Sequence, residues 1–486
     1  MRILMVTAEL APLAKVGGLG DMVASLSAAL AARGHDVRVA LPLYGDLDRA
    51  AHHVAPLLKH PPVPVRVGQE VRLARLHAQR AGSRRVKVYL WENPELFGRE
   101  GIYAGAGGGA FPDALSRAAF HAAAALALPA VTGWTPQVIH CHDAATALVP
   151  VYARRWYRHV PAVAGAGTLL TIHNLAYQGV YPATQLERTG LPAEMAVYPG
   201  TLEFHGKINL MKAGILEADL VNTVSPTYAR EVVADEELGC GLAGVLRSRG
   251  SRFSGILNGA DLDTWDPARD PALAAPFSTD APAGKQACRA ALARELGLAA
   301  ADGPVAGFVG RLVEQKGPEL LLTGLDGLLG QGLRLVVLAT GEERFRTRLL
   351  AAARRRPGRI AFVDRFDEPL AHRVYAGCDL LLMPSRFEPC GLAQMYAMRY
   401  GTVPIVHRTG GLADTVVDAG RPDGTGFVFE PYTAAALRDA VSGALGLWRR
   451  PERWAELVRR GMERCFSWEA SATAYERLYA SLAPGD

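Results

Sequence analysis

Residues 379–416 read DLLLMPSRFEPCGLAQMYAMRYGTVPIVHRTGGLADTV, and this stretch decides the fold. Its short apolar run Leu380–Met383 predicts a buried strand, and Thr402–Val406 predicts a second one. A polar loop and a helical pattern follow each strand, and Gly401 ends the first of the two helices. Because a strand–loop–helix unit occurs twice in one short stretch, the sequence predicts a parallel α/β sheet.

The two polar loops follow the carboxyl ends of these strands, where parallel α/β sheets bind their ligands. The first loop carries Glu388, and the second carries Thr409, Gly410 and Gly411. A carboxylate can accept two sugar hydroxyls, and unobstructed backbone amides suit phosphate or hydroxyl oxygens. The plainer interpretation is that Glu388 only caps its helix and that the glycines only form turns. Two such loops at the same sheet edge favour a ligand site.

The stretch from residue 385 to residue 416 resembles the donor-site signature of bacterial glycogen synthases and plant starch synthases. These enzymes are retaining glucosyltransferases of the GT-B fold, which has two Rossmann-like domains. The sequence departs from the wider superfamily in one place, because Tyr396 stands at the second position of its Glu-x7-Glu pattern. The bacterial branch commonly lacks that second carboxylate, so Tyr396 marks the branch.

The resemblance implies roles for the residues of both loops. Glu388 would act on the donor glucose, with Cys390 and Gly391 continuing the donor loop. The segment Thr409–Gly411 would contact the glucose and the distal phosphate of the nucleotide.

Length and composition limit the classes of protein that fit. At 486 residues the chain predicts two or three domains, and 49% hydrophobic with 21% charged residues is typical of a globular protein. A net charge of +5 is small for this length and gives no case for nucleic acid. The six cysteines form no C-x-x-C pair, no apolar run is long enough for a membrane span, and the N-terminus predicts a strand rather than a signal peptide. We therefore expect a cytoplasmic protein.

The N-terminal segment predicts a Rossmann-type opening. The strand Arg2–Ala8 is followed by the glycine loop KVGGLGD, residues 15–21, and by a helix from Met22 to Arg33. The loop is not the G-x-G-x-x-G pattern of dinucleotide-binding proteins, so a dehydrogenase is disfavoured. It resembles the N-terminal signature of the same synthases, in which Lys15, Gly17 and Gly18 would face the phosphates and sugar of the donor.

The acceptor side is less clearly marked. Glu9, Asp21 and Tyr103 are its candidate residues. Tyr103 is followed by the run AGAGGG, residues 104–109, where the family carries an aromatic and acidic segment.

The segment QVIHCHD, residues 137–143, predicts a strand that ends in polar groups. His140 and His142 alternate on it and would share one face, but no third metal ligand accompanies them. The segment resembles the family's His-Asp-Trp-His block, which would place Asp143 near the donor glucose. Residues 144 and 145 are alanines where the family has Trp and His.

Two further matches carry candidate donor residues. LLTIHN, residues 169–174, predicts a strand with His173 at its end, and HNLAYQG resembles the family segment whose histidine lies against the transferred glucose. A histidine at a strand end can equally serve as a structural hydrogen-bonding residue. In the block ILNGAD, residues 256–261, the resemblance places Asn258 near the donor.

The segment GRLVEQKG, residues 310–317, places two cations in one predicted loop before a helix. A solvated pair of charges is the plain interpretation of Arg311 and Lys316. The resemblance favours a phosphate role, because the family uses this Arg and Lys to neutralise the leaving diphosphate.

The resemblance spans nearly the whole chain and implies two Rossmann-like domains facing each other across a crevice. The first would cover residues 1–255 together with a C-terminal helix, residues 463–486, and the second residues 256–462. The implied reaction transfers glucose from ADP-glucose to the non-reducing end of an α-1,4-glucan such as glycogen, with retention of configuration. No cofactor and no metal are expected, since no Asp-x-Asp-type carboxylate pair is placed to bridge a metal to the diphosphate.

Two alternatives stay open, namely another retaining GT-B hexosyltransferase and a non-catalytic glucan-binding homologue. The sequence leaves the oligomeric state open.

Overall fold

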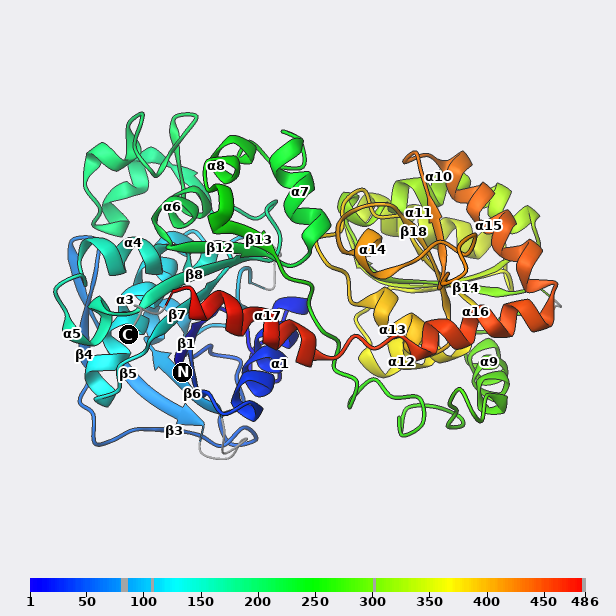
Figure 1. Cartoon of the computed structure of the whole chain (residues 1–486), viewed down its shortest axis with the longest axis horizontal. Coiled ribbons are helices and arrows are strands. Elements are labelled where there is room, and N and C mark those ends of the chain that lie inside the picture. Colours follow the sequence, from blue (N-terminus) through cyan, green and yellow to red (C-terminus); the bar gives the residue numbers. More distant parts are fainter. Residues whose placement is uncertain (80–85, 106–108, 300–302, 483–486) are drawn as a thin grey trace. The chain divides into compact units, whose positions relative to one another are not determined.

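The structure is a computed structural model that describes residues 1–79, 86–105, 109–299 and 303–482 (Figure 1). The chain divides into two compact units. The first unit comprises Met1–Val224, Ala229–Gly259 and Trp468–Asp486, and the second comprises Ser225–Tyr228 and Ala260–Ser467. The structure divides the chain after Gly259 and after Ser467, whereas the sequence predicted divisions after residues 255 and 462.

The first unit is built on a ten-stranded sheet in the order β13-β12-β8-β7-β1-β2-β6-β5-β3, with β4 paired to β5. All strands from β13 to β6 are parallel, and β3, β4 and β5 add an antiparallel margin. The strands are β1 Arg2–Val6, β2 Asp36–Pro42, β3 Val54–Pro56, β4 Val63–Val67, β5 Glu70–Gln79, β6 Val86–Glu92, β7 Val138–His142, β8 Gly167–Ile172, β12 Leu220–Thr223 and β13 Phe253–Gly255. A separate small sheet contains β9 Val180–Pro182, β10 Glu203–Phe204 and β11 Lys207–Asn209.

Helices cover this sheet because their apolar faces bury against it. The helices of this region are α1 Gly18–Ala32, α2 Pro94–Phe97, α3 Ala114–Thr132, α4 Leu148–Arg155, α5 Pro161–Ala164, α6 Leu210–Glu217, α7 Pro226–Ala234, α8 Ala243–Arg247 and α17 Trp468–Ala480. One core cluster joins β1 and β2 to α1 and α17, with Tyr475 and Tyr479 of α17 fully buried. The C-terminal helix is therefore an integral part of the first unit's core.

Helix α3 is the one described helix that is long and apolar enough to cross a membrane by length and composition. Of its most apolar window, 72% is buried inside the protein. The alanine-rich run Ala122–Ala125 is almost completely inaccessible, which is the environment of a core helix.

The second unit has a six-stranded, fully parallel sheet in the order β16-β15-β14-β17-β18-β19. Its strands are β14 Val305–Leu312, β15 Arg334–Gly341, β16 Ile360–Val363, β17 Leu380–Met383, β18 Val403–His407 and β19 Phe427–Phe429. Its helices are α9 Ala283–Glu295, α10 Pro318–Gly330, α11 Glu343–Arg355, α12 Glu368–Gly377, α13 Ala393–Arg399, α14 Gly410–Thr415, α15 Ala434–Trp448 and α16 Pro451–Glu463.

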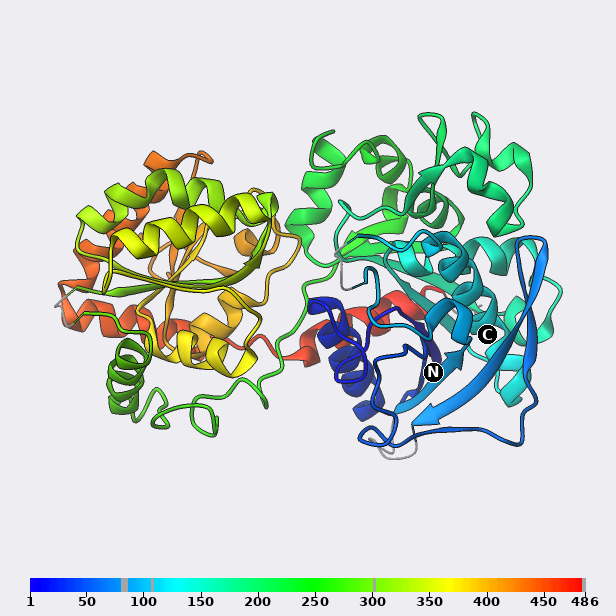
Figure 2. The same ribbon diagram turned by 180° about the vertical axis from the view of Figure 1, so that it is seen from behind.

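Alternate residues of β15 show that both faces of this sheet are covered. Leu335 and Val337 belong to a cluster with α10, α11 and α15, while Val336 and Leu338 pack with α9 and α12. Figure 2 shows these helices in two layers with the strands between them. Such burial on both faces explains why the strands are continuous apolar runs rather than alternating ones.

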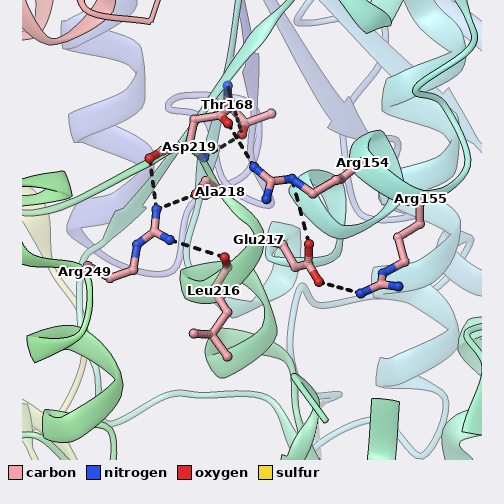
Figure 3. Close-up of polar contacts among 8 residues, drawn as sticks. All are labelled: Arg154, Arg155, Thr168, Leu216, Glu217, Ala218, Asp219 and Arg249. Atoms are coloured by element: carbon pink, nitrogen blue, oxygen red, sulfur yellow. Dashed lines mark hydrogen bonds and ion pairs between the residues drawn. The ribbon is translucent and has the colours of Figure 1, made fainter. Parts of the chain in front are cut away.

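A cluster of hydrogen bonds and ion pairs around the α6–β12 turn stabilises the first unit's sheet where strands β8 and β12 begin (Figure 3). Asp219 accepts hydrogen bonds from the backbone N–H and the hydroxyl of Thr168, at 2.8 and 2.7 Å, and from Arg154 at 3.0 Å. Arg249 donates to the last carbonyls of α6, at Leu216 and Ala218, and thereby satisfies acceptors that a helix end leaves open. This cluster fixes the start of β8, the strand that carries a candidate site residue at its other end.

Candidate functional site

In each sheet the order in which the chain adds strands reverses near the centre, and each of these switch points marks a candidate ligand-binding region within its own unit. In the first unit the chain builds outward from β1 through β2 and β6, then returns to β7 and continues the other way. In the second unit it builds from β14 to β15 and β16, then returns to β17. Ligands of open α/β sheets bind beyond the carboxyl ends of the strands at such points. The loops after β1, β7, β14 and β17 are therefore the candidate ligand-binding loops of the two units.

The loop after β1 is organised by the buried carboxylate of Glu9. Its Oε2 accepts hydrogen bonds from the backbone N–H groups of Val16 and Gly17, at 2.8 and 3.0 Å. Its Oε1 accepts from the hydroxyl of Tyr103 at 2.8 Å. Glu9 thus joins the glycine loop to the segment that carries Tyr103, and this contact brings two acceptor-side candidates together.

The glycine loop leads directly into α1. Gly17 is the extended N-cap residue and Gly18 begins the helix, four residues before the expected start at Met22. Lys15 Nζ lies 3.0 Å from the carboxylate of Asp21, both partly exposed. The early helix start follows from the glycine run, because residues without side chains fit the tight turn into a helix. Of the run after Tyr103, residues 106–108 lie outside the described part of the chain.

Asp143 and His173 follow the neighbouring strands β7 and β8 and lie together. Asp143 Oδ1 accepts a hydrogen bond from the backbone N–H of His173 at 2.7 Å. Asp143 itself has a positive φ of 58°, a conformation that non-glycine residues seldom adopt and that points to a functional position. The two predicted glucose-side residues are therefore adjacent.

Burial sets the protonation states of this pair. It raises the pKa of Asp143 to about 7, a rise that the charge of Glu9 reinforces and the backbone hydrogen bonds from His173 and Asn174 oppose. Burial lowers the pKa of His173 to about 3, so its imidazole is neutral at physiological pH. The site therefore holds a neutral imidazole beside a carboxyl group that titrates near neutrality.

Asn258 lies in the first unit, three residues after β13 ends. Its side chain is buried, and its Oδ1 has no hydrogen-bond partner among the residues that the structure describes. A buried acceptor of this kind is uncommon in folded proteins and is available to a bound ligand or water.

In the second unit, Lys316 and Glu388 meet across the switch point. Lys316 Nζ donates to Glu388 Oε2 at 2.5 Å, and the hydroxyl of Ser385 donates to the same oxygen at 3.0 Å. Glu388 is 4% exposed. The N-cap residue of α13 is Leu392, so Glu388 does not cap that helix, and the plain interpretation of this residue is wrong.

The loops that carry these residues touch through glycines. A Cβ on Gly317 would lie 1.8 Å from the carbonyl oxygen of Pro384, and one on Gly410 would lie 2.0 Å from that of Glu388. Both have positive φ, as does Gly391. Gly411 donates its N–H to the carbonyl of Glu388 at 3.0 Å, and a Cβ there would meet the carbonyl of Cys390 at 2.0 Å. The glycines thus allow close loop packing in addition to turning the chain.

Arg311 differs from expectation in its location. The sequence predicted it in a loop with Lys316, but β14 continues to Leu312, and Arg311 pairs with Thr340 of β15. The strand is longer because β15 runs on to Gly341 and supplies ladder partners. The exposed side chain of Arg311 still lies at the carboxyl end of the strand that precedes Lys316.

The remaining donor candidates lie at the same edge. Thr409 is the buried N-cap residue of α14, and Cys390 is buried and forms no disulfide with another described residue. Tyr396 points elsewhere: its ring stacks on Trp265 at 4.1 Å, and Trp265 stacks in turn on His372 at 3.8 Å. The position where the superfamily carries a second carboxylate is therefore a packing position in this chain.

Two residues and one contact near the candidate residues were not expected from the sequence. Ser385 holds Glu388, and His142 contacts His173, with Nδ1 and Nε2 3.1 Å apart. Phe366, in the loop after β16, is 78% exposed at the same edge as Lys316. Phe366 could have been noticed in the sequence, because it is an aromatic residue in a polar segment. The contacts of Ser385 with Glu388 and of His142 with His173 depend on the fold.

Metal-ligating side chains are not clustered. Within residues 1–79, 86–105, 109–299 and 303–482, no group of three or more His, Cys, Asp or Glu residues could hold a metal ion. The nitrogens of His140, which the sequence raised as a possible ligand, contact Tyr479 and Thr171 instead.

Comparison with known proteins assigns the chain to a family. Residues 2–248 match the family described as starch synthase catalytic domain, and residues 293–460 match glycosyl transferases group 1. A glycogen synthase of Anaeromyxobacter dehalogenans is 47% identical over 100% of both chains. Glycogen synthase 2 of Geobacter metallireducens is 45% identical over 99% of both.

Solved structures agree. The catalytic domain of starch synthase IV from Arabidopsis thaliana, bound to ADP and acarbose, matches with a TM-score of 0.91 and 33% identity over 99% of each chain. Sucrose-phosphate synthase from Thermosynechococcus elongatus shares the fold, with a TM-score of 0.61 and 21% identity. The GT-B fold expected from the sequence is confirmed, and the chain belongs to the glycogen and starch synthase family of glycosyltransferases.

Proposed function

We propose that this glycosyltransferase elongates an α-1,4-glucan, transferring glucose from ADP-glucose to the non-reducing end with retention of configuration. The observation that carries the proposal is the contact between the half-buried Lys316 and the buried carboxylate of Glu388 at the switch point of the second unit. Family membership over the whole chain supports it. The ADP on the Arabidopsis starch synthase and the bacterial character of the relatives favour ADP-glucose over UDP-glucose.

The second unit supplies what a leaving nucleotide diphosphate needs. Breaking the glucose–phosphate bond gives ADP with growing negative charge, and fixed cations stabilise that charge. Arg311 offers a planar fork for two phosphate oxygens, and Lys316 offers a point charge. Thr409 and Gly410, at the start of α14, lie where the distal phosphate and the sugar would bind, whereas the N–H of Gly411 is held by the carbonyl of Glu388. The exposed ring of Phe366 provides a face on which the adenine base can stack.

The first unit supplies groups for sugar hydroxyls. Asp143 and His173 act on the transferred glucose, and Asn258 offers an amide oxygen that the described residues leave unbonded. Lys15, Gly17 and Gly18 face the donor. Glu9, Asp21 and Tyr103 form the acceptor side, because an aromatic ring beside carboxylates is a common surface for carbohydrates.

The reaction is proposed to need no metal. Arg311 and Lys316 take the charge-neutralising role that a metal would otherwise have. The protein is proposed to act in the cytoplasm, where its six free cysteines would stay reduced.

A glucan-elongation assay tests the proposal. The protein is incubated with glycogen and either ADP-glucose or UDP-glucose, with and without EDTA. We expect elongation with ADP-glucose that survives EDTA, and a new α-anomeric signal in the proton NMR spectrum of the product. Transfer only to fructose phosphate or another small acceptor would indicate a different GT-B hexosyltransferase. Glycogen binding without transfer would indicate a non-catalytic homologue. Loss of activity in EDTA that added magnesium restores would overturn the proposal that the reaction needs no metal.

A further inference from the structure

His142 is a buried histidine next to the site that the proposed reaction does not yet use. It ends β7, one residue before Asp143, and its side chain is fully inaccessible. Its Nδ1 lies 3.1 Å from Nε2 of His173. Two imidazoles at this distance share one hydrogen bond, so one ring donates and the other accepts. Which ring donates decides what His173 can offer a substrate.

The neighbouring ring of His140 has a fixed tautomer. The hydroxyl of Thr171 donates to Oδ1 of Asn222 at 2.6 Å, so it can only accept from His140 Nε2, which lies 2.6 Å away. His140 Nδ1 then accepts from the hydroxyl of Tyr479 at 2.8 Å. Both nitrogens of His140 are therefore used. Its ring centroid lies 4.1 Å from that of His142, which holds His142 in place.

His142 has one nitrogen left over. Its Nε2 is buried, and within the described parts of the chain it has no hydrogen-bond partner. Buried N–H groups without a partner are rarer in proteins than buried acceptors without one. Nε2 of His142 is therefore assigned as the unprotonated nitrogen. The proton of His142 then resides on Nδ1 and is donated to His173 Nε2. His173 in turn must carry its own proton on Nδ1.

We propose that His142 is a positioning residue that fixes the tautomer of His173, so that His173 presents an Nδ1–H donor at the carboxyl end of β8. The proposal rests on the proposed function, in which His173 meets the transferred glucose. An Nδ1–H donates to a sugar hydroxyl oxygen, whereas the other tautomer would present a bare acceptor. Burial lowers the pKa values of both rings far enough that each is neutral and holds a single proton.

The proposal explains why an imidazole stands at position 142. A buried polar atom without a partner costs stability, and an apolar side chain at this position would avoid the cost. Asp143 accepts a hydrogen bond from the backbone N–H of His173, and in the described part of the chain it forms none with the imidazole ring. Control of the ring therefore falls to His142.

Two variants and one spectrum test the proposal on the full chain. Asn at position 142 can place an amide N–H where Nδ1 of the histidine was, whereas Leu cannot donate at all. The tautomer is observed in the ¹⁵N NMR spectrum of protein labelled with ¹⁵N-histidine, and the signals of His173 are those that disappear in a His173→Gln variant. We expect the His173 proton on Nδ1 in the wild type and in His142→Asn. In His142→Leu we expect it to move to Nε2, and kcat with ADP-glucose and glycogen to fall about tenfold with little change in KM. His142→Asn should stay within about threefold of wild type.

The spectrum and the assay separate two kinds of failure. If wild type elongates glycogen but carries the His173 proton on Nε2, the tautomer assignment is wrong and the proposed function stands. If His142→Leu folds and keeps wild-type kcat, or if His142→Asn loses as much as His142→Leu, position 142 does not act through that proton. If wild type transfers no glucose while the tautomer shifts as expected, the proposed function fails instead.

Discussion

Single charged residues of the second unit decide whether its switch point can bind a diphosphate. Glu388 is a buried carboxylate whose charge is balanced by the ammonium group of Lys316. It also accepts a hydrogen bond from the hydroxyl of Ser385. An ammonium group has three donors, so Lys316 can keep this contact and still meet a phosphate oxygen. The pair therefore places a cation next to the carboxylate proposed to contact the sugar, which suits a reaction that breaks the bond between sugar and phosphate.

Removing the cations should slow the chemical step more than it weakens binding. We expect Lys316→Ala to lower kcat on the order of 10²–10³, comparable to deleting an oxyanion-hole donor, because the charge it meets grows toward the transition state. Arg311→Lys should also lower kcat, since it keeps the charge but loses the fork. Steady-state kinetics measures both, with Arg355→Ala as the control for an exposed cation of the same unit. Near wild-type kcat in both variants, with the fold intact by circular dichroism, would make Arg311 and Lys316 solvated charges only.

Asp143 should make stability depend on pH in an unusual direction. Its folded pKa, raised by burial to about 7, lies above the ordinary value of 3.8, so the folded protein binds a proton that the unfolded chain releases between these pH values. The carboxyl group therefore costs stability progressively as pH rises from about 4 to about 7, and the full cost applies above that range. Asp143→Asn keeps an oxygen for the His173 N–H and removes the charge. Because the side chain is partly exposed, we expect a gain of about 1–2 kcal/mol at pH 8 and little gain at pH 4.

Urea unfolding of both proteins at the two pH values measures this difference. A gain that is equal at both values would mean that Asp143 is not the titrating group.

At the scale of elements, the site depends on how closely two loops approach. The turn between β14 and α10 passes so near the end of β17 that position 317 has room for no side chain. Gly317 also has a positive φ of 70°, which adds backbone strain to the steric clash for any other residue. The contact holds Lys316 within reach of Glu388.

Substituting this glycine should therefore displace the lysine. For Gly317→Ala we expect kcat to fall by at least tenfold and the free energy of unfolding to fall by about 2–4 kcal/mol. Gly330→Ala is the matched control, because it lies at the other end of the same helix, where a Cβ meets no atom within 4 Å. Kinetics and urea unfolding on the pair give the comparison. Equal behaviour of the two variants would show that the close approach is not needed.

The sequence predicted the elements well where local signals were strong. The strands β17 and β18 and the loops after them were found because apolar runs, polar loops and glycines occur in the order that a parallel sheet needs. Arg311 was misplaced because strand length depends on the partner strand, and β15 lies more than twenty residues away in sequence. Tyr396 could be recognised as a departure, but its stacking on Trp265 joins residues that only the fold brings together. The same holds for the contact between His142 and His173.

At the scale of the whole molecule, the two units differ in their buried titratable groups. The described part of the first unit contains five histidines whose pKa values are lowered by burial, namely His77, His121, His140, His142 and His173. In the described part of the second unit, one histidine, His407, has a lowered pKa, again because of burial. Histidines that are neutral when folded take up protons on unfolding once the pH falls below about 6.5. Their contribution to stability is present above that value and is lost as pH falls toward the folded pKa values.

The first unit should therefore lose stability first on acidification. Each such histidine contributes up to about 1.4 kcal/mol per pH unit, and Asp143 offsets part of this because its raised pKa acts in the opposite direction. Between pH 7.5 and pH 5.5 we expect the first unit to lose about 3–5 kcal/mol and the second unit about 1 kcal/mol or less. Urea unfolding followed by pulsed hydrogen exchange and mass spectrometry distinguishes the units, since peptides from β7 and β8 report the first and peptides from β14 and β17 the second.

His121→Gln provides the control, because an amide can replace the hydrogen bond between His121 Nε2 and the carbonyl of Thr7 without titrating. This variant should reduce the histidine contribution to the first unit's acid sensitivity by roughly a fifth and leave the second unit unchanged. Parallel losses in both units, or an unchanged first unit, would mean that buried imidazoles do not control the acid response. The first unit would then owe its acid sensitivity to carboxylates held in ion pairs, such as Glu476, whose pKa the hydrogen bond from Arg33 lowers to about 2. That sensitivity would begin below pH 4.5 rather than below pH 6.5, so the pH at which β7 and β8 first lose protection separates the two causes.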